Sequence, residues 1–324
     1  MVVAWIVAFN SSALIAGCLS AIKPWVDRAY VLENGSGDEE REKLAQIISQ
    51  ESDWVWLLVS PKNLGFGPGM NFIRRNSEYV GSEVLWLVNP DIVAVQGTPE
   101  LAIAALETGE AHVVSPCVIS TVKGVETVLF SGGHIDIRSG RADHRDFGRP
   151  VAALGDAVGF EITDFVTGAA PLMLVRTWDA LGGFREDLFM YWEDVDLSLR
   201  ATQAGMKLAV DMGFRVSHLA GASVVETDAR RSDLFYYYTS RGRVIVCGES
   251  SSLTSVLFWP GGIHSIRLII KPIVRESSRR FIKSGRVIMG LLSGARAVIA
   301  TRANRRRQAS KKRLRIAHQD EIGR

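Results

Sequence analysis

Short apolar runs alternate with helical segments over about the first 115 residues, and this alternation constrains the fold more than any other feature. Continuous apolar runs such as Val2–Phe9 and Val84–Val88 are typical of strands buried on both faces. Charged or amphipathic helical segments separate such runs, as at Ala13–Ile22 and Asp38–Gln50. Because parallel strands need crossover connections, the pattern predicts an α/β fold with a doubly wound, mostly parallel sheet.

Polar motifs follow three of the predicted strands at their carboxyl ends. They are Asn-Ser-Ser at 10–12, Glu-Asn-Gly-Ser-Gly-Asp at 33–38 and Asn-Pro-Asp at 89–91. Ligands of doubly wound sheets bind outside the carboxyl ends of the strands. The sequence therefore predicts that these motifs share one site.

The rest of the chain is less regular. Residues 118–161 are rich in Gly, Asp and Arg and predict hairpins and loops. Phe165–Arg176 predicts another buried strand, and Lys207–Val210 and Arg215–Ser217 predict two short ones. From Leu234 onward the pattern is helical.

Charge and cysteine content narrow the class of protein. The net charge is +3, yet residues 301–316 carry eight Lys or Arg and no acid, so the remainder of the chain is mildly acidic. Cys18, Cys117 and Cys247 fit neither a zinc site nor a disulfide framework, which favours a cytoplasmic setting. The first apolar run lacks a basic leader and is expected to be a strand, not a signal peptide.

Asp91 and His218 are the candidate metal ligands. A carboxylate at the end of a buried strand can hold a hard divalent cation, although Asn-Pro-Asp is also an ordinary turn sequence. His218 follows a short predicted strand, and either ligates a metal or serves as a structural histidine. Metal ligation by each residue becomes the stronger interpretation if Asp91 and His218 lie close together in the fold.

An acidic cluster, Glu193, Asp194 and Asp196, follows a run of bulky apolar residues that includes Tyr191 and Trp192. At helical spacing Glu193 and Asp196 share a face. Acids also stabilise a helix N-terminus, and the aromatic residues could simply be core. The other interpretation is that apolar surroundings desolvate one carboxylate and make it a general base.

A glycine-rich stretch, NLGFGPGMN, spans residues 63–71. Its glycines permit a close approach of backbone to a ligand. It matches neither the P-loop nor the G-x-G-x-x-G pattern, so it does not identify a phosphate site by itself.

The ordered set of motifs resembles the family 2 glycosyltransferases, and within them the rhamnosyltransferase-like and galactofuranosyltransferase-like branch. The likeness runs from Val2 to Val246 through VAFNS, VLENGSGD, NLGFGPGMN, LWLVNPD, TGAAPLMLVR, YWEDVDLSLR and VSHLAGAS. The resemblance implies a GT-A fold. It also implies an enzyme that transfers a hexose from a nucleoside-diphosphate sugar, in cell-wall or polysaccharide biosynthesis.

The resemblance also implies roles for individual residues. Asp194 stands at the position of the catalytic base, while Asp91 and His218 stand at the positions of ligands to Mg²⁺ or Mn²⁺. The implied nucleotide or donor contacts are Phe9, Asn10, Ser11, Glu33, Asn63, Gly65, Asn89 and Asp91. The implied acceptor contacts are Tyr191, Trp192 and Glu193.

Three positions depart from the family pattern. Asn89 replaces the first aspartate of a strict D-x-D motif, Glu33 replaces an aspartate that faces the base, and Gly242 stands where an asparagine is frequent. The expected donor is dTDP-rhamnose first, then UDP-galactofuranose or another UDP-hexose. The expected acceptor is a glycan or a polyprenyl-linked glycan. A single base on one face of the sugar predicts inversion at the anomeric carbon.

The expected organisation is a GT-A domain over 1–250, with a nucleotide-binding half at 1–115 and an acceptor-binding half at 116–250, followed by a basic helical extension at 251–324. That extension either lies on the anionic inner face of the cell membrane or packs as a helical layer with a disordered tail. No nucleic-acid-reading motif accompanies the charge, so a nucleic-acid partner is not expected.

Two rival functions remain. A GT-A-type nucleotidyltransferase would carry a glycine-rich, basic phosphate loop near the N-terminus, and VAFNSSALIAG has none. A catalytically silent nucleotide-sugar-binding homologue would act as a membrane-associated assembly subunit. Loss of transfer without loss of nucleotide binding in Asp194→Asn would separate the enzyme from the silent homologue.

Overall fold

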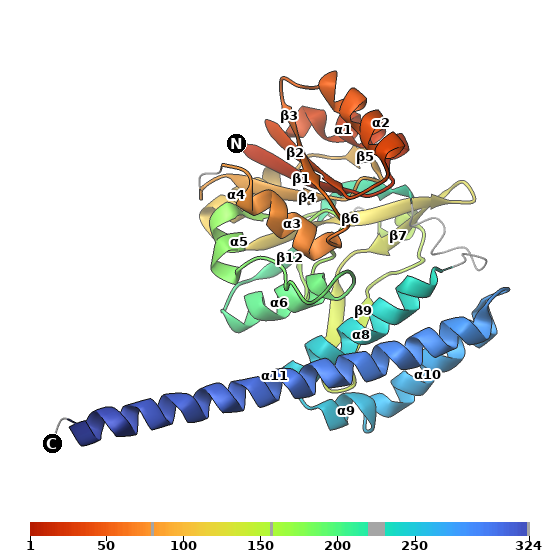
Figure 1. Ribbon diagram of the computed structural model, residues 1–324. Helices are drawn as coiled ribbons and strands as arrows, with labels where there is room; N and C mark the ends of the chain where they lie inside the picture. The colour runs from red at the N-terminus through yellow and green to blue at the C-terminus, as the bar shows by residue number, and fades with distance from the viewer. Residues whose placement is uncertain (79–80, 156–157, 220–230, 323–324) are drawn as a thin grey trace. The chain divides into compact units, whose positions relative to one another are not determined.

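The computed structural model describes residues 1–78, 81–155, 158–219 and 231–322, with side chains described as far as residue 308. The chain forms two compact units. The first comprises Met1–Ile135 and Ala142–Ala229, and the second comprises Asp136–Arg141 and Arg230–Arg324 (Figure 1). The second unit therefore begins before residue 250, and α8 (Asp233–Ser250) belongs to it. The functional division into nucleotide and acceptor halves stays a prediction.

A sheet of ten described strands forms the centre of the first unit, in the order β10-β12-β6-β11-β4-β1-β2-β3, with β5 paired to β12 and β7 paired to β6. Strands β1 to β4 run parallel, as do β6 and β12, and the other pairs are antiparallel. The mostly parallel sheet predicted from the sequence is confirmed. Its strands are β1 (Val2–Ala8), β2 (Arg28–Asn34), β3 (Val55–Ser60), β4 (Val84–Val88), β5 (Ile92–Gln96), β6 (Val113–Val122), β7 (Val125–Phe130), β10 (Phe160–Ile162), β11 (Leu172–Leu174) and β12 (Leu208–His218). A separate pair, β8 (Gly133–Asp136) and β9 (Arg141–His144), spans the boundary between the units.

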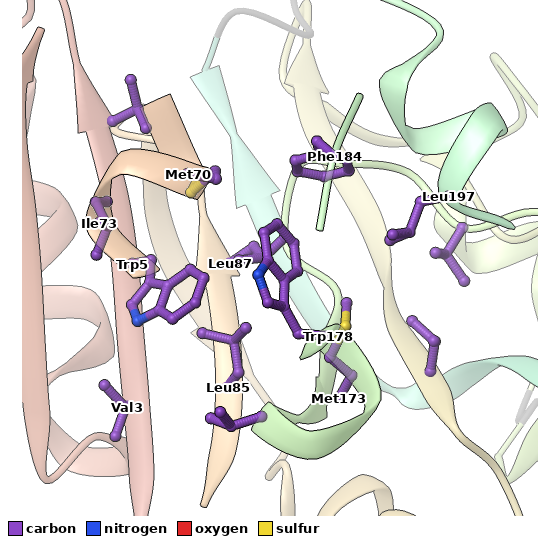
Figure 2. Packing of buried hydrophobic residues seen from close by; sticks show 14 of the residues in the cluster. Val3, Trp5, Met70, Ile73, Leu85, Leu87, Met173, Trp178, Phe184 and Leu197 are labelled. Carbon is purple, nitrogen blue, oxygen red and sulfur yellow. The ribbon is translucent and has the colours of Figure 1, made fainter. Parts of the chain in front are cut away.

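Helices cover both faces of this sheet (Figure 1). The helices are α1 (Ser12–Ile22), η1 (Lys23–Trp25), α2 (Asp38–Ser49), α3 (Phe66–Arg75), α4 (Glu100–Thr108), η2 (Val151–Leu154), α5 (Val175–Leu181) and α6 (Glu193–Gln203). On one face, alternate residues of β1 and β4 pack against α3, α5 and α6. Trp178 lies at the centre of this layer, with its ring 5.2 Å from that of Trp5 and 5.0 Å from that of Phe184 (Figure 2). This packing fixes α6, and with it the acidic cluster, against the sheet.

Two predicted strands differ from the structure. Only Leu172–Leu174 of the predicted strand Phe165–Arg176 is extended, and α5 begins at Val175. The regular strand does not extend further back because Pro171 has no N–H to donate and the Gly168 N–H donates to Asp194. The carbonyls of Pro171 and Ala169 still accept from the N–H groups of Leu87 and Asn89, in register with β4. The two short strands predicted between 207 and 217 are one strand, β12, with a register shift between Asp211 and Arg215.

The second unit is helical, as the sequence predicts for its main part. It contains α8, α9 (Leu253–Leu257), α10 (Gly261–Arg275) and α11 (Arg280–Ile322). Helices α8 and α11 pack closely against one another. A Cβ at Gly290 would lie only 2.3 Å from the Tyr237 carbonyl oxygen, so the close approach requires glycine there. Gly294, one turn further along, meets the Arg241 carbonyl in the same way. Small residues at such positions let two helix backbones approach.

Arg243 of α8 is the polar centre of this unit and is 1 % exposed. Its guanidinium donates to the carbonyls of Gly140 (2.8 Å), Ser139 (2.8 Å), Val256 (2.9 Å) and Gly261 (3.1 Å) and to the Ser265 hydroxyl (3.0 Å). Burial lowers the pKa of Arg243 to about 10. The charge is thus satisfied by neutral oxygens that tie α8, α9 and α10 to the 136–141 segment.

Arg243→Met is expected to lower the free energy of unfolding of the second unit by at least about 3 kcal/mol, because each buried carbonyl left without a donor costs about 1–3 kcal/mol. Arg296→Met, at an exposed position of α11, is the matched control and should change stability by less than about 0.5 kcal/mol. Native-state hydrogen exchange of the α8 amides in urea measures both. Equal protection in the two variants would show that the buried guanidinium is not a stabilising centre.

Candidate functional site

The site lies where the strand order of the sheet reverses. β1 pairs with β2 on one side and with β4 on the other, and the connections diverge at this point. The register places Ala8 opposite Glu33 and Ile6 opposite Val88. The segments that follow β1, β2 and β4 therefore emerge at one edge of the sheet, as predicted from the three polar motifs.

Asn89, Asp91 and His218 meet at this edge. His218 Nε2 lies 3.0 Å from Asp91 Oδ1 and 3.2 Å from Asn89 Nδ2. The side chains of Asp91 and His218 are 13 % and 15 % exposed, so both are mostly enclosed yet accessible. The two candidate ligands, far apart in sequence, are confirmed as neighbours.

Two strand pairings bring His218 to Asp91. β12 lies beside β6 and also pairs with β5, with His218 opposite Ile92. The Leu219 N–H then donates to the Asp91 carbonyl at 3.0 Å. The bulge in β12, held by Asp211 accepting from the N–H groups of Gly213 and Phe214, sets the register of the residues that follow it.

Asp194 is joined to this cluster through Gly168 and Ala169. The Gly168 N–H donates to Asp194 Oδ2 at 3.0 Å, and the Ala169 carbonyl accepts from the Asn89 N–H at 2.9 Å. Two residues of chain span at most about 7 Å, so Asp194 Oδ2 lies within about 13 Å of the Asn89 nitrogen. Asp194 and the Asn89–Asp91 turn therefore belong to one region of the first unit.

Burial raises the pKa of both carboxyl groups at the start of α6. Glu193 is 6 % exposed, and its Oε2 has no hydrogen-bond partner among the described residues. Its pKa is raised well above the usual range by burial and then by the neighbouring charge of Asp194. The pKa of Asp194 is also raised by burial, but the N–H groups of Gly168 and Val195 oppose that rise. Glu193 therefore takes up a proton before Asp194, which leaves Asp194 as the ionised carboxylate of the pair.

Tyr191 and Trp192 have left-handed backbone conformations, with φ of 65° and 72°. Such conformations are strained for bulky residues and cluster at functional sites. Both side chains are partly exposed, so neither is fully buried core. Helix α6 begins directly after them, as the acidic pattern predicts.

The glycine-rich loop is tied to the same region. Gly65 has φ of 90°, and a Cβ there would lie 2.0 Å from the Phe189 carbonyl oxygen. That carbonyl accepts from the Phe66 N–H at 2.9 Å, where α3 begins. Asn63 Oδ1 accepts from the Gly65 N–H at 2.8 Å and lies 3.2 Å from Asn34 Nδ2. The loop is thus held between the end of β2 and the lead into α6.

The segment after β1 combines exposed and buried groups. Phe9 is 44 % exposed, and Asn10 is exposed with φ of 49°. The Asn10 N–H donates to Ser36 Oγ at 3.0 Å. Ser11 is buried, and its hydroxyl has no partner among the described residues. Glu33, at 1 % exposed, accepts from the Ser36 N–H at 2.6 Å, so its carboxylate is engaged by its own turn.

Several residues of this region were not found from the sequence. Asn34 organises the glycine-rich loop through Asn63 and the Gly65 carbonyl, and its only sequence signal is its place in the turn after β2. Gly168 and Ala169 act through their backbone, which leaves no side-chain signature. The charge of His144 lowers the pKa of Asp194, although His144 lies fifty residues earlier in the sequence.

The donor atoms of Asp91 and His218 are of types that bind a divalent cation. Asp91 offers a carboxylate oxygen and His218 an imidazole nitrogen, a donor pair suited to Mn²⁺ and tolerable for Mg²⁺. His218 Nδ1 has no partner in the described part of the chain, so it can carry the ring proton while Nε2 presents its lone pair to a cation. No third Asp, Glu, His or Cys joins the pair within the described residues, so a cation would take its other ligands from phosphate oxygens and water.

No family model and no curated protein sequence matches the chain. The solved structures that share its fold include the following two. GalNAc-T7, crystallised with UDP, GalNAc and Mn²⁺, has a TM-score of 0.55 and 13% identity over 68% of this chain and 43% of its own. The mannosyltransferase PcManGT from Pyrobaculum calidifontis, in complex with GDP-Man and Mn²⁺, has a TM-score of 0.51 and 13% identity over 94% of this chain and 79% of its own.

The matched region thus spans less than half of GalNAc-T7. The likeness to both structures lies in the fold, a mostly parallel sheet with flanking helices and a C-terminal helical region, which is of the GT-A type.

Proposed function

We propose that this protein is an inverting, metal-assisted glycosyltransferase that moves a hexose from a nucleoside-diphosphate sugar to a glycan or lipid-linked glycan. L-rhamnose, carried as dTDP-rhamnose, is the first candidate, and a UDP-hexose is the second. The observation that carries the proposal is the meeting of Asn89, Asp91 and His218 at the switch point, with Asp194 joined to them through Gly168 and Ala169.

The fold adds support. Two proteins of the same fold were crystallised with nucleotides or nucleotide sugars and Mn²⁺. In this chain the carboxyl ends of β1, β2 and β4 offer an edge at which the nucleotide would bind, near Phe9–Ser11, Glu33 and the loop at Asn63–Gly65. The buried Ser11 hydroxyl, which has no partner in the described ranges of the chain, can both donate to and accept from such a ligand.

Asp91 and His218 would hold the cation at the diphosphate, and Asn89 would orient them. A divalent cation there stabilises the negative charge that develops on the leaving diphosphate. The protein fixes the imidazole beside the carboxylate, as the 3.0 Å contact indicates. The site is mostly enclosed, which strengthens the electrostatic interaction between the residues and the charged donor.

Asp194 would take the proton of the acceptor hydroxyl as that hydroxyl attacks the anomeric carbon. Its pKa is raised by burial, which makes it a stronger base than an exposed aspartate. The neighbouring Glu193, protonated more readily, would donate a hydrogen bond to the sugar or the acceptor. The partly exposed rings of Tyr191 and Trp192 would stack on the acceptor sugar.

Nucleotide-sugar hydrolysis by the purified chain tests the proposal. The panel is dTDP-rhamnose, UDP-galactofuranose, other UDP-hexoses and GDP-mannose, each with Mn²⁺ or with EDTA. We expect release of the nucleoside diphosphate from one donor class, dTDP-rhamnose first, and only with the metal. Failure to hydrolyse or bind any donor would contradict the proposal. Binding without hydrolysis, even with acceptor glycans, would favour a silent homologue.

A further inference from the structure

We infer that the second unit docks on the surface of an anionic lipid bilayer through an exposed apolar face of α10 and α11. This surface belongs to the second unit alone. The inference does not depend on the proposed function, because a sugar acceptor and a nucleotide play no part in it. None of the helices among the described residues is both long and apolar enough to cross a bilayer, so the contact would be interfacial.

Helix α10 exposes an apolar row on the side that faces away from its own unit. The exposed members of the row follow a spacing of three, four and four residues, which places them on one side of the helix: Ile263 (49 % exposed), Ile266 (58 %), Ile270 (47 %) and Val274 (75 %). The buried residues of α10 lie on the opposite side: Gly261, Ser265 and Pro272. An ordinary surface helix has the reverse arrangement.

This row borders an apolar groove formed with α11. The groove has a volume of about 570 Å³, and its walls include Trp259, Ile263, Ile266, Ile288 and Leu292. Trp259, two residues before the first residue of α10, is 75 % exposed, and Phe258 beside it is 73 % exposed. Exposed aromatic rings next to exposed aliphatic residues are typical of surfaces that lie at the bilayer interface.

The charge of residues 261–308 is almost entirely positive. Residues 261–308 contain twelve Lys or Arg and a single acid, Glu276. Glu276 is buried, where it pairs with Lys283 and accepts from the Tyr236 hydroxyl at 2.8 Å. Beside the apolar row, α10 exposes a row of basic residues: Arg267, Lys271 and Arg275.

This combination selects an anionic bilayer among the possible occupants. A second copy of the chain on the same face would bring two rows of like charge together, which disfavours association. A nucleic acid would satisfy the arginines but would leave the isoleucine row in water. A bilayer with anionic headgroups takes the apolar row into its interface and neutralises the basic row at its surface.

Vesicle co-sedimentation of the full chain, without donor or acceptor, tests the inference. The vesicles are phosphatidylcholine alone or phosphatidylcholine mixed with phosphatidylglycerol. Wild-type chain is expected to sediment with the anionic vesicles and much less with the neutral ones, and added salt is expected to weaken binding.

Two variants separate the contributions of charge and apolar surface. The triple variant Arg267→Gln/Lys271→Gln/Arg275→Gln is expected to weaken partitioning into anionic vesicles by about 100-fold. The variant Ile263→Ser/Ile266→Ser/Ile270→Ser is expected to weaken it by at least about tenfold. Matched controls are Arg41→Gln/Lys43→Gln and Leu101→Ser/Ile162→Ser, at solvent-accessible positions of the first unit, and both should bind like wild type. Circular dichroism checks that each variant is folded.

Three results would overturn the inference. One is equal binding of wild type to neutral and anionic vesicles, or to neither. Another is full vesicle binding by the isoleucine variant, which would indicate a polyanion site. The third is a wild-type dimer that the isoleucine variant converts to monomer, which would assign the face to a second copy. Sugar transfer to a soluble acceptor would survive all three, so failure here is distinguishable from failure of the proposed function.

Discussion

Asp194→Asn is expected to reduce sugar transfer by about 10²–10⁴-fold, the usual contribution of a general base, while nucleotide-sugar binding remains near the wild-type level. The amide cannot accept the proton of the attacking hydroxyl. Its NH₂ must also face the N–H of either Gly168 or Val195, which now donate to the two carboxylate oxygens. Single-turnover transfer and donor binding by calorimetry measure the two effects separately.

Asp196→Asn is the matched control on the same helix. Its carboxylate contacts Arg200 at 2.8 Å and Arg185 at 3.7 Å, so it stabilises structure without serving as the base. The Asp196 side chain is only 9 % exposed, so the substitution is expected to lower stability. Transfer by the folded variant should nevertheless stay within about threefold of wild type, because the contribution of a general base, about 10²–10⁴-fold, is not removed. If Asp194→Asn and Asp196→Asn lose sugar transfer equally, the loss comes from a general disturbance of α6. Asp194 would then not be assigned as the base.

The pH profile gives an independent readout of the same assignment. A base acts only when deprotonated, so transfer is present above its pKa and is lost as the pH falls through it. Because burial raises the pKa of Asp194, the acid limb should lie above the value of about 3.9 for an ordinary aspartate. The residual transfer of Asp194→Asn should lack that limb.

Asp91→Asn is expected to raise the Mn²⁺ concentration needed for half-maximal transfer by about 100-fold or more, because changes around a metal site commonly cost about 10–100-fold and this one removes a direct carboxylate ligand. The charge beside His218 Nε2 disappears, while the hydrogen-bonding shape of the turn is kept. Titration of activity with Mn²⁺ after EDTA treatment measures the shift, and high Mn²⁺ should restore part of the rate.

The chain offers a matched control in a second histidine–carboxylate pair. His134 Nδ1 lies 2.5 Å from Asp164 Oδ2 in the same unit, but the two side chains are 75 % and 50 % exposed. Asp164→Asn removes an equivalent carboxylate and should leave the Mn²⁺ dependence unchanged. Two results would refute the metal assignment. One is that EDTA does not reduce transfer by wild type, and the other is that Asp91→Asn has the same Mn²⁺ dependence of transfer as wild type.

Much of the fold could be predicted because it depends on local pattern. The run Val84–Val88 is a strand with the predicted bounds, and α6 begins at Glu193, where acids meet the helix N-terminus. Phe165–Arg176 was wrong as a single strand for a reason that local pattern cannot supply. The Gly168 N–H bonds Asp194, which lies elsewhere in the sequence, and α5 begins at Val175.

The candidate site was predictable only as a list of side chains. Asp91 and His218 could be named from their places after buried strands, but their contact depends on β12 pairing with both β5 and β6. Asn34 and Gly168 were missed because an asparagine in a turn and a backbone N–H carry no distinctive residue type. The left-handed conformations of Tyr191 and Trp192 likewise follow from the packing around them.

The sequence by itself determined the alternation of strands and helices, the polar motifs at the strand ends and the basic character of the C-terminal helices. These follow from periodicity and composition, which act over a few residues. Only the tertiary structure decided that His218 meets Asp91, that Gly168 holds Asp194, and that the isoleucine row of α10 faces outward. Such contacts depend on strand register and helix orientation, which are fixed when distant segments pack together and bury their apolar surface.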